Sequence, residues 1–291
     1  MLRLNVPCRL RRLVLPVIAA CGLAVSFAAP AVAGQRASTA RLDPKGVQLV
    51  DTYLQRSRHA TTNAELLRAD ASAERIFAHV RGAGATYDKR SLDTIATYVV
   101  RAGMPDLKAD LGSNLVVYND ALGYVTKSNL FELMKLSPDV LHRIRAAGTT
   151  IHVGDRPITT MAGLGTLTGT SARGHEAAEL WEDVGGAYSP DENVVAAGRG
   201  NASYMRYRGM ILHELGHAYD DETKLSATSE FRALQQSVGR LTDPYYAQAG
   251  DAGPQEYFAD LCRAYWTGGT AKVKQDFGSA AAAWMTVKVP R

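Results

Sequence analysis

Residues 213–217, His-Glu-Leu-Gly-His, limit the fold of this chain more than any other feature of its sequence. Two side chains four positions apart on an α-helix lie on one face, about one turn apart. The two histidines can therefore act together if this stretch is helical. Residues 210–212 are Met, Ile and Leu, which makes the surroundings apolar. The sequence predicts a buried helix over about 203–219 that presents two imidazoles on one face.

Paired imidazoles of this kind are typical of zinc sites, in which the metal takes a tetrahedral set of ligands. His213 and His217 are the predicted ligands, and Glu214 lies beside the first of them. A glutamate in that position can take a proton from water at the metal and pass it to a leaving amine. The H-E-x-x-H pattern thus predicts a zinc hydrolase with Glu214 as general base. The alternative is a pair of ordinary core or surface histidines.

A third ligand has to come from elsewhere in the chain. Thr223 occupies the position six residues after His217, so the extended H-E-x-x-H pattern of the metzincins is absent. Glu256 and Asp260 lie four apart in a predicted helix over 254–267, and the residues between them are mostly apolar. Glu256 is the predicted third ligand, and Asp260 is predicted to orient a ligand from outside the metal's own shell. Two acids on a helix can also form a solvated face.

The stretch HELGHAYDD at 213–221, followed by Glu256 in EYFAD, resembles the zincin metallopeptidases related to anthrax lethal factor and the secreted Pro-Pro endopeptidases. The likeness is sharp from about 205 to 265 and extends weakly upstream to about 148. It implies that His213, His217 and Glu256 bind one zinc ion. It also implies that Glu214 is the base and that Asp260 supports the ligands.

The same resemblance implies a catalytic tyrosine shortly before the ligand glutamate, where its hydroxyl stabilises the tetrahedral oxyanion. The spacing in the family falls on Ala249, so this chain departs from the pattern. Tyr245 and Tyr246 are the nearest tyrosines, and the prediction favours Tyr246. The alternative is that both tyrosines only pack.

The resemblance further implies that substrate lies extended along an edge strand just upstream of the metal helix. The candidate strand is 193–197, in which Val194, Val195 and Ala196 are expected to hydrogen-bond to the substrate backbone, as in strand addition. The alternative is an internal strand with both edges occupied.

Helical patterns dominate up to about residue 146, and short strand patterns lie between there and the metal helix. The predicted fold is α+β and mainly helical, with a zincin-like catalytic half: a small sheet, the H-E-x-x-H helix and a following glutamate helix. The predicted division is a signal peptide at 1–33, a helical N-terminal region at 34–145 and a metallopeptidase domain at 146–291. No linker marks the boundary near 145.

Residues 1–33 have the layout of a secretory signal peptide, with four arginines, an apolar run over 13–29 and Ala-Val-Ala at 31–33. Cleavage after Ala33 predicts export to the periplasm or the medium, with no membrane span left in the mature chain. A membrane anchor and lipid attachment at Cys21 are the alternatives.

Removing the leader also changes the charge of the chain. Its four arginines leave 29 of the 33 basic residues, which equals the 29 acidic residues. A neutral mature chain gives no basic surface for nucleic acid, so the expected partner is a peptide or protein substrate. The sequence therefore predicts an exported zinc-dependent endopeptidase. The alternative is an exported zinc-binding or partner-binding module that has lost catalysis.

Overall fold

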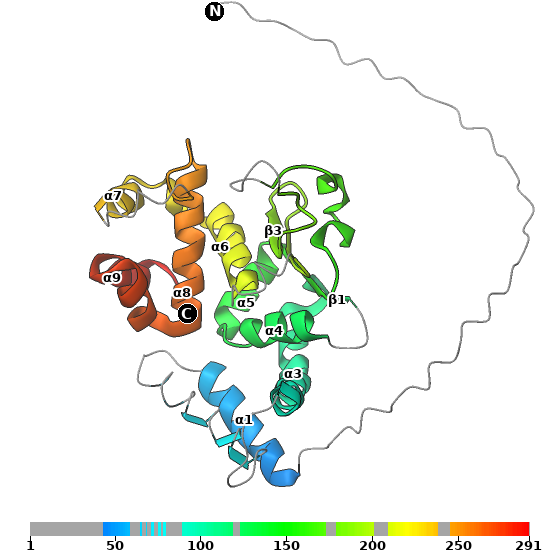
Figure 1. Cartoon of the computed structure of the whole chain (residues 1–291). Helices are drawn as coiled ribbons and strands as arrows, with labels where there is room; N and C mark the ends of the chain where they lie inside the picture. Colours follow the sequence, from blue (N-terminus) through cyan, green and yellow to red (C-terminus); the bar gives the residue numbers. More distant parts are fainter. Residues whose placement is uncertain are drawn as a thin grey trace, which may run out of the picture. The chain divides into compact units, whose positions relative to one another are not determined.

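A four-stranded mixed sheet with helices packed on one face forms the centre of the fold (Figure 1). The computed structural model describes residues 43–58, 65, 68, 71–72, 75–76, 78–79, 89–118, 123–172, 179–200, 209–237 and 245–290. Ala40–Arg291 form one compact unit. The predicted leader at 1–33 lies outside the described residues. The predicted α+β fold, mainly helical with a small sheet, is confirmed.

The sheet has the strand order β1-β2-β4-β3. Its strands are β1 (Leu115–Tyr118), β2 (Thr150–Gly154), β3 (Gly186–Ser189) and β4 (Val194–Ala197). The first three in this order run parallel, and β3 joins β4 as an antiparallel hairpin. The strand predicted to bind substrate is therefore interior, because β4 pairs with β2 on one side and β3 on the other. The edge beside the metal helix belongs to β3.

Side-chain alternation gives the two faces of the sheet different neighbours. Ile151, Val153 and Val195 point into the main core, which the helices complete. Val194 and Ala196 point to the opposite face, where a smaller apolar cluster formed by the long connection after β2 covers them. Both faces are buried, which explains why the β4 sequence reads as a continuous apolar run rather than an alternating one.

Two helices after the sheet, α6 (Met210–Thr223) and α8 (Ala252–Phe277), pack closely against one another, and α6 also contacts β3 and β4 (Figure 1). Gly216 permits the close approach, since a Cβ atom there would lie 2.8 Å from the Cα of Ala259. The backbone of α8 departs from helical geometry at Gly269, just after the end of the helix predicted over 254–267. Helices α7 (Ser229–Ser237) and α9 (Ser279–Lys288) complete this part of the fold.

The N-terminal helices pack on the same core. They are α1 (Pro44–Arg58), α3 (Lys89–Leu111), α4 (Tyr124–Leu133) and α5 (Pro138–Ala146), and short 3-10 helices span Gly112–Asn114, Ile158–Thr160, Gly165–Leu167 and Leu225–Ala227. The carboxylate of Asp43 accepts from the amide of Gly46 at 2.7 Å, and the hydroxyl of Ser137 caps α5, as their sequence positions predict.

The predicted boundary near residue 145 stays a prediction. Strands β1 and β2 lie on opposite sides of it and pair directly, and α4 contacts both β2 and α6. A search of the helices that the structure describes found none with the length and apolarity of a membrane span.

Candidate metal centre

His213 and His217 lie on one face of α6, as their spacing predicts. Leu212 and Leu215 are fully buried in the core, which fixes the rotation of the helix about its axis. The two imidazole rings meet edge to face with their centroids 4.8 Å apart. Their Nε2 atoms lie 3.2 Å from each other.

Glu256 reaches the two histidines from α8. Its Oε2 atom lies 3.1 Å from Nε2 of His213 and 3.1 Å from Nε2 of His217. The three candidate ligand atoms therefore form a nearly equilateral triangle. Neighbouring ligand atoms at the corners of a zinc tetrahedron, with bonds of 2.0–2.1 Å, lie about 3.3 Å apart. The three side chains thus match the ligand set and the spacing of a zinc site with one open position.

The charges around this triangle also suit a cation. Burial alone would raise the pKa of Glu256, but hydrogen bonds from His213 and His217 outweigh it and hold that pKa well below its usual range. Burial would lower the pKa of His213, but the charge and hydrogen bond of Asp260 raise it to about 10. Buried carboxylates that favour an imidazolium at this place also favour a divalent cation there.

Glu214 lies beside the triangle and turns toward the sheet. Its side chain is buried, and a Cβ atom on Gly186 of β3 would lie 2.9 Å from its Cγ and Oε1 atoms. Burial raises the pKa of Glu214, although the charges of His213 and His217 oppose this shift. A carboxylate between the metal ligands and an edge strand is well placed to exchange a proton with groups bound in the site.

Asp260 lies one turn beyond Glu256 on α8 and faces the far side of the first histidine. Its Oδ1 atom accepts from Nδ1 of His213 at 2.9 Å. Burial would raise the pKa of Asp260, but the charge of His213 lowers it to about 2. The arrangement is the usual one for a carboxylate that orients a metal-binding histidine through its second nitrogen.

The two tyrosines before α8 have separate partners, and the geometry favours Tyr245 over Tyr246 as the residue in the site. The hydroxyl of Tyr245 donates to Oε2 of Glu256 at 2.6 Å and lies at the cavity that holds the histidines. The hydroxyl of Tyr246 is buried and donates to Oδ2 of Asp260 at 2.6 Å. Tyr246 therefore faces the supporting carboxylate rather than the cavity.

The edge strand β3, in place of β4, borders this cavity. The amide of Gly198 donates to the carbonyl of Gly185 at 2.9 Å, just beyond the paired strands. Hydrogen-bonded and non-hydrogen-bonded pairs alternate along an antiparallel ladder. From this register the backbone groups of Gly186 and Tyr188 point away from β4, toward the edge where the structure describes no further strand. Val194, Val195 and Ala196 are enclosed between β2 and β3.

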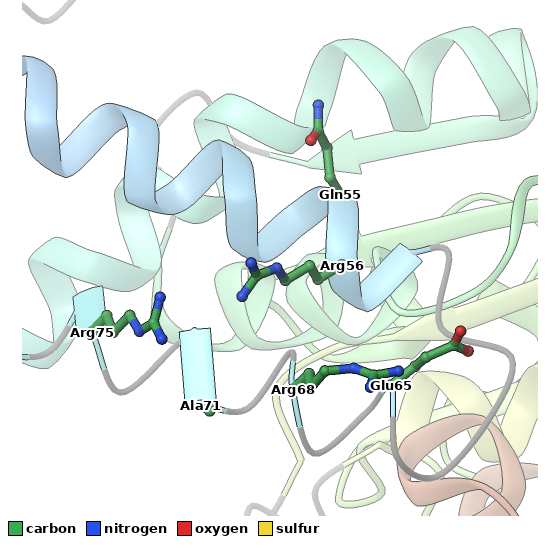
Figure 2. A pocket seen from close by; sticks show the side chains of 6 residues that line it. All are labelled: Gln55, Arg56, Glu65, Arg68, Ala71 and Arg75. Atoms are coloured by element: carbon green, nitrogen blue, oxygen red, sulfur yellow. The ribbon is translucent and has the colours of Figure 1, made fainter.

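A second cavity, near α1, lacks the histidines and buried carboxylates of the candidate metal centre. A cavity of about 670 Å³ near α1 is lined by Arg56, Arg68, Arg75 and Glu65, among others (Figure 2). Its arginines are exposed to solvent. The cavity of about 440 Å³ between β3, α6 and α8 holds both histidines and the buried carboxylates Glu214 and Glu256. Buried titratable groups with shifted pKa values identify the cavity between β3, α6 and α8 as the candidate site.

Sequence reasoning missed two aromatic residues of this cavity, Trp181 and Tyr188. The hydroxyl of Tyr188 donates to Asp221 at 3.2 Å, which links the edge strand to the end of α6. Positions two apart on a strand face the same side of the sheet, so the spacing of Gly186 and Tyr188 was the available signal for Tyr188.

Comparison with known proteins adds two findings. The model of the family described as anthrax toxin lethal factor, N- and C-terminal domain, matches residues 121–276, which is just over half of the chain. The solved structure of the Pro-Pro endopeptidase PPEP-2 from Paenibacillus alvei is 24% identical, with a TM-score of 0.48, and the match covers 60% of this chain and 97% of that one. No curated protein matches the sequence.

Proposed function

Because the chain belongs to the anthrax toxin lethal factor family, we propose that it is an exported zinc-dependent endopeptidase. One observation carries the proposal: the triangle of buried His213 and Glu256 with half-buried His217, and the buried Glu214 beside it. A purely structural zinc site is closed by four protein ligands and needs no adjacent base. Three ligands and a buried carboxylate are the composition of a hydrolytic site.

Different residues of the site have different roles in the proposed hydrolysis. Zinc held by the three ligands would supply Lewis-acid chemistry at the site and lower the pKa of water there. Glu214 accepts a proton from the attacking water and delivers it to the departing amine. The hydroxyl of Tyr245 lies at the cavity beside Glu256, where it can donate to negative charge that develops on the carbonyl oxygen.

An extended peptide would lie along β3. The outward backbone groups of Gly186 and Tyr188 can form hydrogen bonds with its main chain, in the manner of an added strand. The proximity of Gly186 to Glu214 supports this placement, because it brings a peptide on the strand edge close to the base. Specificity for side chains then falls to the cavity walls, which include Trp181 and Tyr188.

Export rests on the sequence. The arginines, the apolar run and the small residues of 1–33 support removal of the leader and a periplasmic or secreted mature protein. A peptide or protein is the proposed substrate, and the neutral mature chain supports no nucleic-acid partner.

Zinc content is the first test of the proposal. Purified mature protein is expected to contain about one zinc ion per chain by elemental analysis. The His217→Ala variant removes one of three ligands and is expected to lose most of the metal. Full zinc occupancy in that variant would place the metal somewhere else.

Peptide cleavage is the second test, and it separates the enzyme from the rival module. The wild type is expected to cleave members of a peptide library, to stop when a chelator is added and to recover when zinc is restored. Zinc binding without cleavage of any peptide would favour the module that has lost turnover. The departure at Ala249 was the one sequence feature in favour of that rival, and Tyr245 provides a hydroxyl near the ligands instead.

A further inference from the structure

The carboxylate of Asp260 is surrounded by donors. Its Oδ1 atom accepts from Nδ1 of His213 and from the guanidinium of Arg263, both at 2.9 Å. Its Oδ2 atom accepts from the hydroxyl of Tyr246 at 2.6 Å. Each oxygen therefore has a different partner, and rotation of the carboxylate about its last bond would break bonds on both sides. The orientation of Asp260 depends on all three residues.

Tyr246 can act in this way because its own position is determined from two sides. The side chain of Gln235 on α7 donates to the carbonyl of Tyr246 at 3.2 Å. Gly253, in the first turn of α8, lies so close that a Cβ atom there would be 2.4 Å from the same carbonyl. The tyrosine ring meets the ring of Tyr257 edge to face, with centroids 5.3 Å apart. The hydroxyl is thus aimed at Asp260 by backbone and ring packing together.

The chain of contacts ends at a proposed metal ligand. An ionised carboxylate only accepts, so in the neutral imidazole that a metal ion would bind, the bond between Asp260 and His213 puts the remaining proton on Nδ1. The lone pair of Nε2 is then directed at the triangle it forms with His217 and Glu256. Second-shell contacts of this kind fix both the tautomer and the ring orientation of a metal-binding histidine.

We propose that Tyr246 is a positioning residue, which acts through Asp260 to hold His213 ready for the metal. Its neighbour Tyr245 has a separate role, because its hydroxyl touches Glu256 at the cavity. Of these two adjacent tyrosines, Tyr246 helps to retain zinc and Tyr245 assists turnover. The inference rests on the zinc site of the proposed function but not on peptide hydrolysis.

The rate of zinc loss tests this division directly. Zinc-loaded mature protein is mixed with excess chelator, and release is followed with a chromogenic zinc indicator. Tyr246→Phe removes only the hydroxyl and is expected to release zinc faster than the wild type, by at most about 10- to 100-fold, which is the usual loss of metal affinity when the direct partner of a ligand is removed. Tyr265→Phe, at a buried tyrosine within α8, is the matched control and is expected to release zinc at the wild-type rate.

Tyr245→Phe provides the opposite pattern. This variant is expected to release zinc within about threefold of the wild-type rate, while kcat falls about 100-fold or more from the loss of one donor to the oxyanion. Equal zinc release from Tyr246→Phe and the wild type would overturn the proposal. Fast release from Tyr245→Phe and not from Tyr246→Phe would reverse the two roles.

A double-mutant cycle then shows whether Tyr246 acts through Asp260. Asp260→Asn alone is expected to release zinc fast, and adding Tyr246→Phe is expected to change the rate no further. If the two substitutions instead multiply their effects on the rate of zinc release, Tyr246 acts by a route other than Asp260, which contradicts the proposal. A wild type that binds zinc without cleaving peptides would contradict the proposed function. The measurement of zinc release needs no peptide, so it would still test the role of Tyr246.

Discussion

Glu214, Glu256 and Asp260 are all buried, yet their neighbours give each a different chemistry. Glu256 contacts both imidazoles, so its charge is directed at the metal. Asp260 is held by His213, Tyr246 and Arg263 on its two oxygens. Glu214 instead lies close to Gly186 of the edge strand. Partners, rather than residue type, distinguish the proposed ligand, the proposed supporting carboxylate and the proposed base.

Glu214→Gln is expected to keep the zinc and to reduce peptide cleavage by about 10²- to 10⁴-fold, because an amide preserves the shape but cannot accept a proton. Elemental analysis and kcat/KM on the same preparation measure both effects. Glu222→Gln, at an exposed glutamate near the end of the same helix, is the control and is expected to behave as the wild type. Undiminished cleavage by a zinc-loaded Glu214→Gln protein would remove the assigned role.

The metal triangle depends on how closely α6 and α8 approach each other. Gly216 lies between His213 and His217 in sequence, and a Cβ atom there would come within 3.1 Å of the Ala259 carbonyl oxygen and of Cβ of Cys262. Ala259 lies between Glu256 and Asp260 on the facing helix. The contact thus sits at the level of the ligands, and any separation of the helices moves Glu256 away from the histidines.

Gly216→Ala is expected to destabilise the protein by about 1–3 kcal/mol, because backbone atoms of Ala259 cannot yield to an added methyl group. Urea-induced unfolding measures the change as a lower midpoint concentration, with the dependence of the unfolding free energy on urea concentration unchanged. Gly165→Ala is the control, since the nearest atom to a Cβ there lies 3.9 Å away. Stability of Gly216→Ala equal to or above that of the wild type would show that the helices adjust without cost.

The edge strand β3 leads to a prediction about substrate. A complex with a peptide-like inhibitor is expected to show main-chain hydrogen bonds to Gly186 and Tyr188, because their backbone groups point away from β4. A crystal structure of the complex measures this directly. Inhibitor bonded to Val194 or Val195 would require the hairpin to open, and inhibitor bound away from β3 would contradict the placement while leaving the zinc site unchanged.

At the scale of the whole molecule, the family match begins at residue 121 and so includes α4, β2, β3 and β4 together with α6 and most of α8. The matched region contains every proposed ligand and the base. Helices α1 and α3 precede it, and α3 packs against α4, α5 and β1. The catalytic half is therefore built on a helical layer that the family model does not cover.

The mature protein is expected to begin at Gly34 with no lipid on Cys21, because small residues at 31–33 follow an apolar run that continues well past Cys21. Intact mass of the protein recovered from the medium or periplasm decides this. A mass that corresponds to a diacylated Cys21 terminus would show anchoring to a membrane, and retention of 1–33 would show that the leader is not cleaved.

The sequence by itself determined the features that depend on local spacing. The four-residue interval of His213 and His217 defines one helix face, and the apolar residues around it require burial. The resemblance to the lethal factor family, read from 213–221 and Glu256, is confirmed by the family match. The α+β class is confirmed as well, since helical periods and short apolar strand runs are also local properties.

Only the tertiary structure decided which side chains meet across elements. Tyr245 and Tyr246 are adjacent in the sequence, and the packing of their loop between α7 and α8 sends one hydroxyl to Glu256 and the other to Asp260. Strands β3 and β4 follow one another in the sequence before the metal helix, and their order in the sheet depends on where β2 pairs. Pairing partners are set by contacts between distant residues, which spacing along the chain does not record.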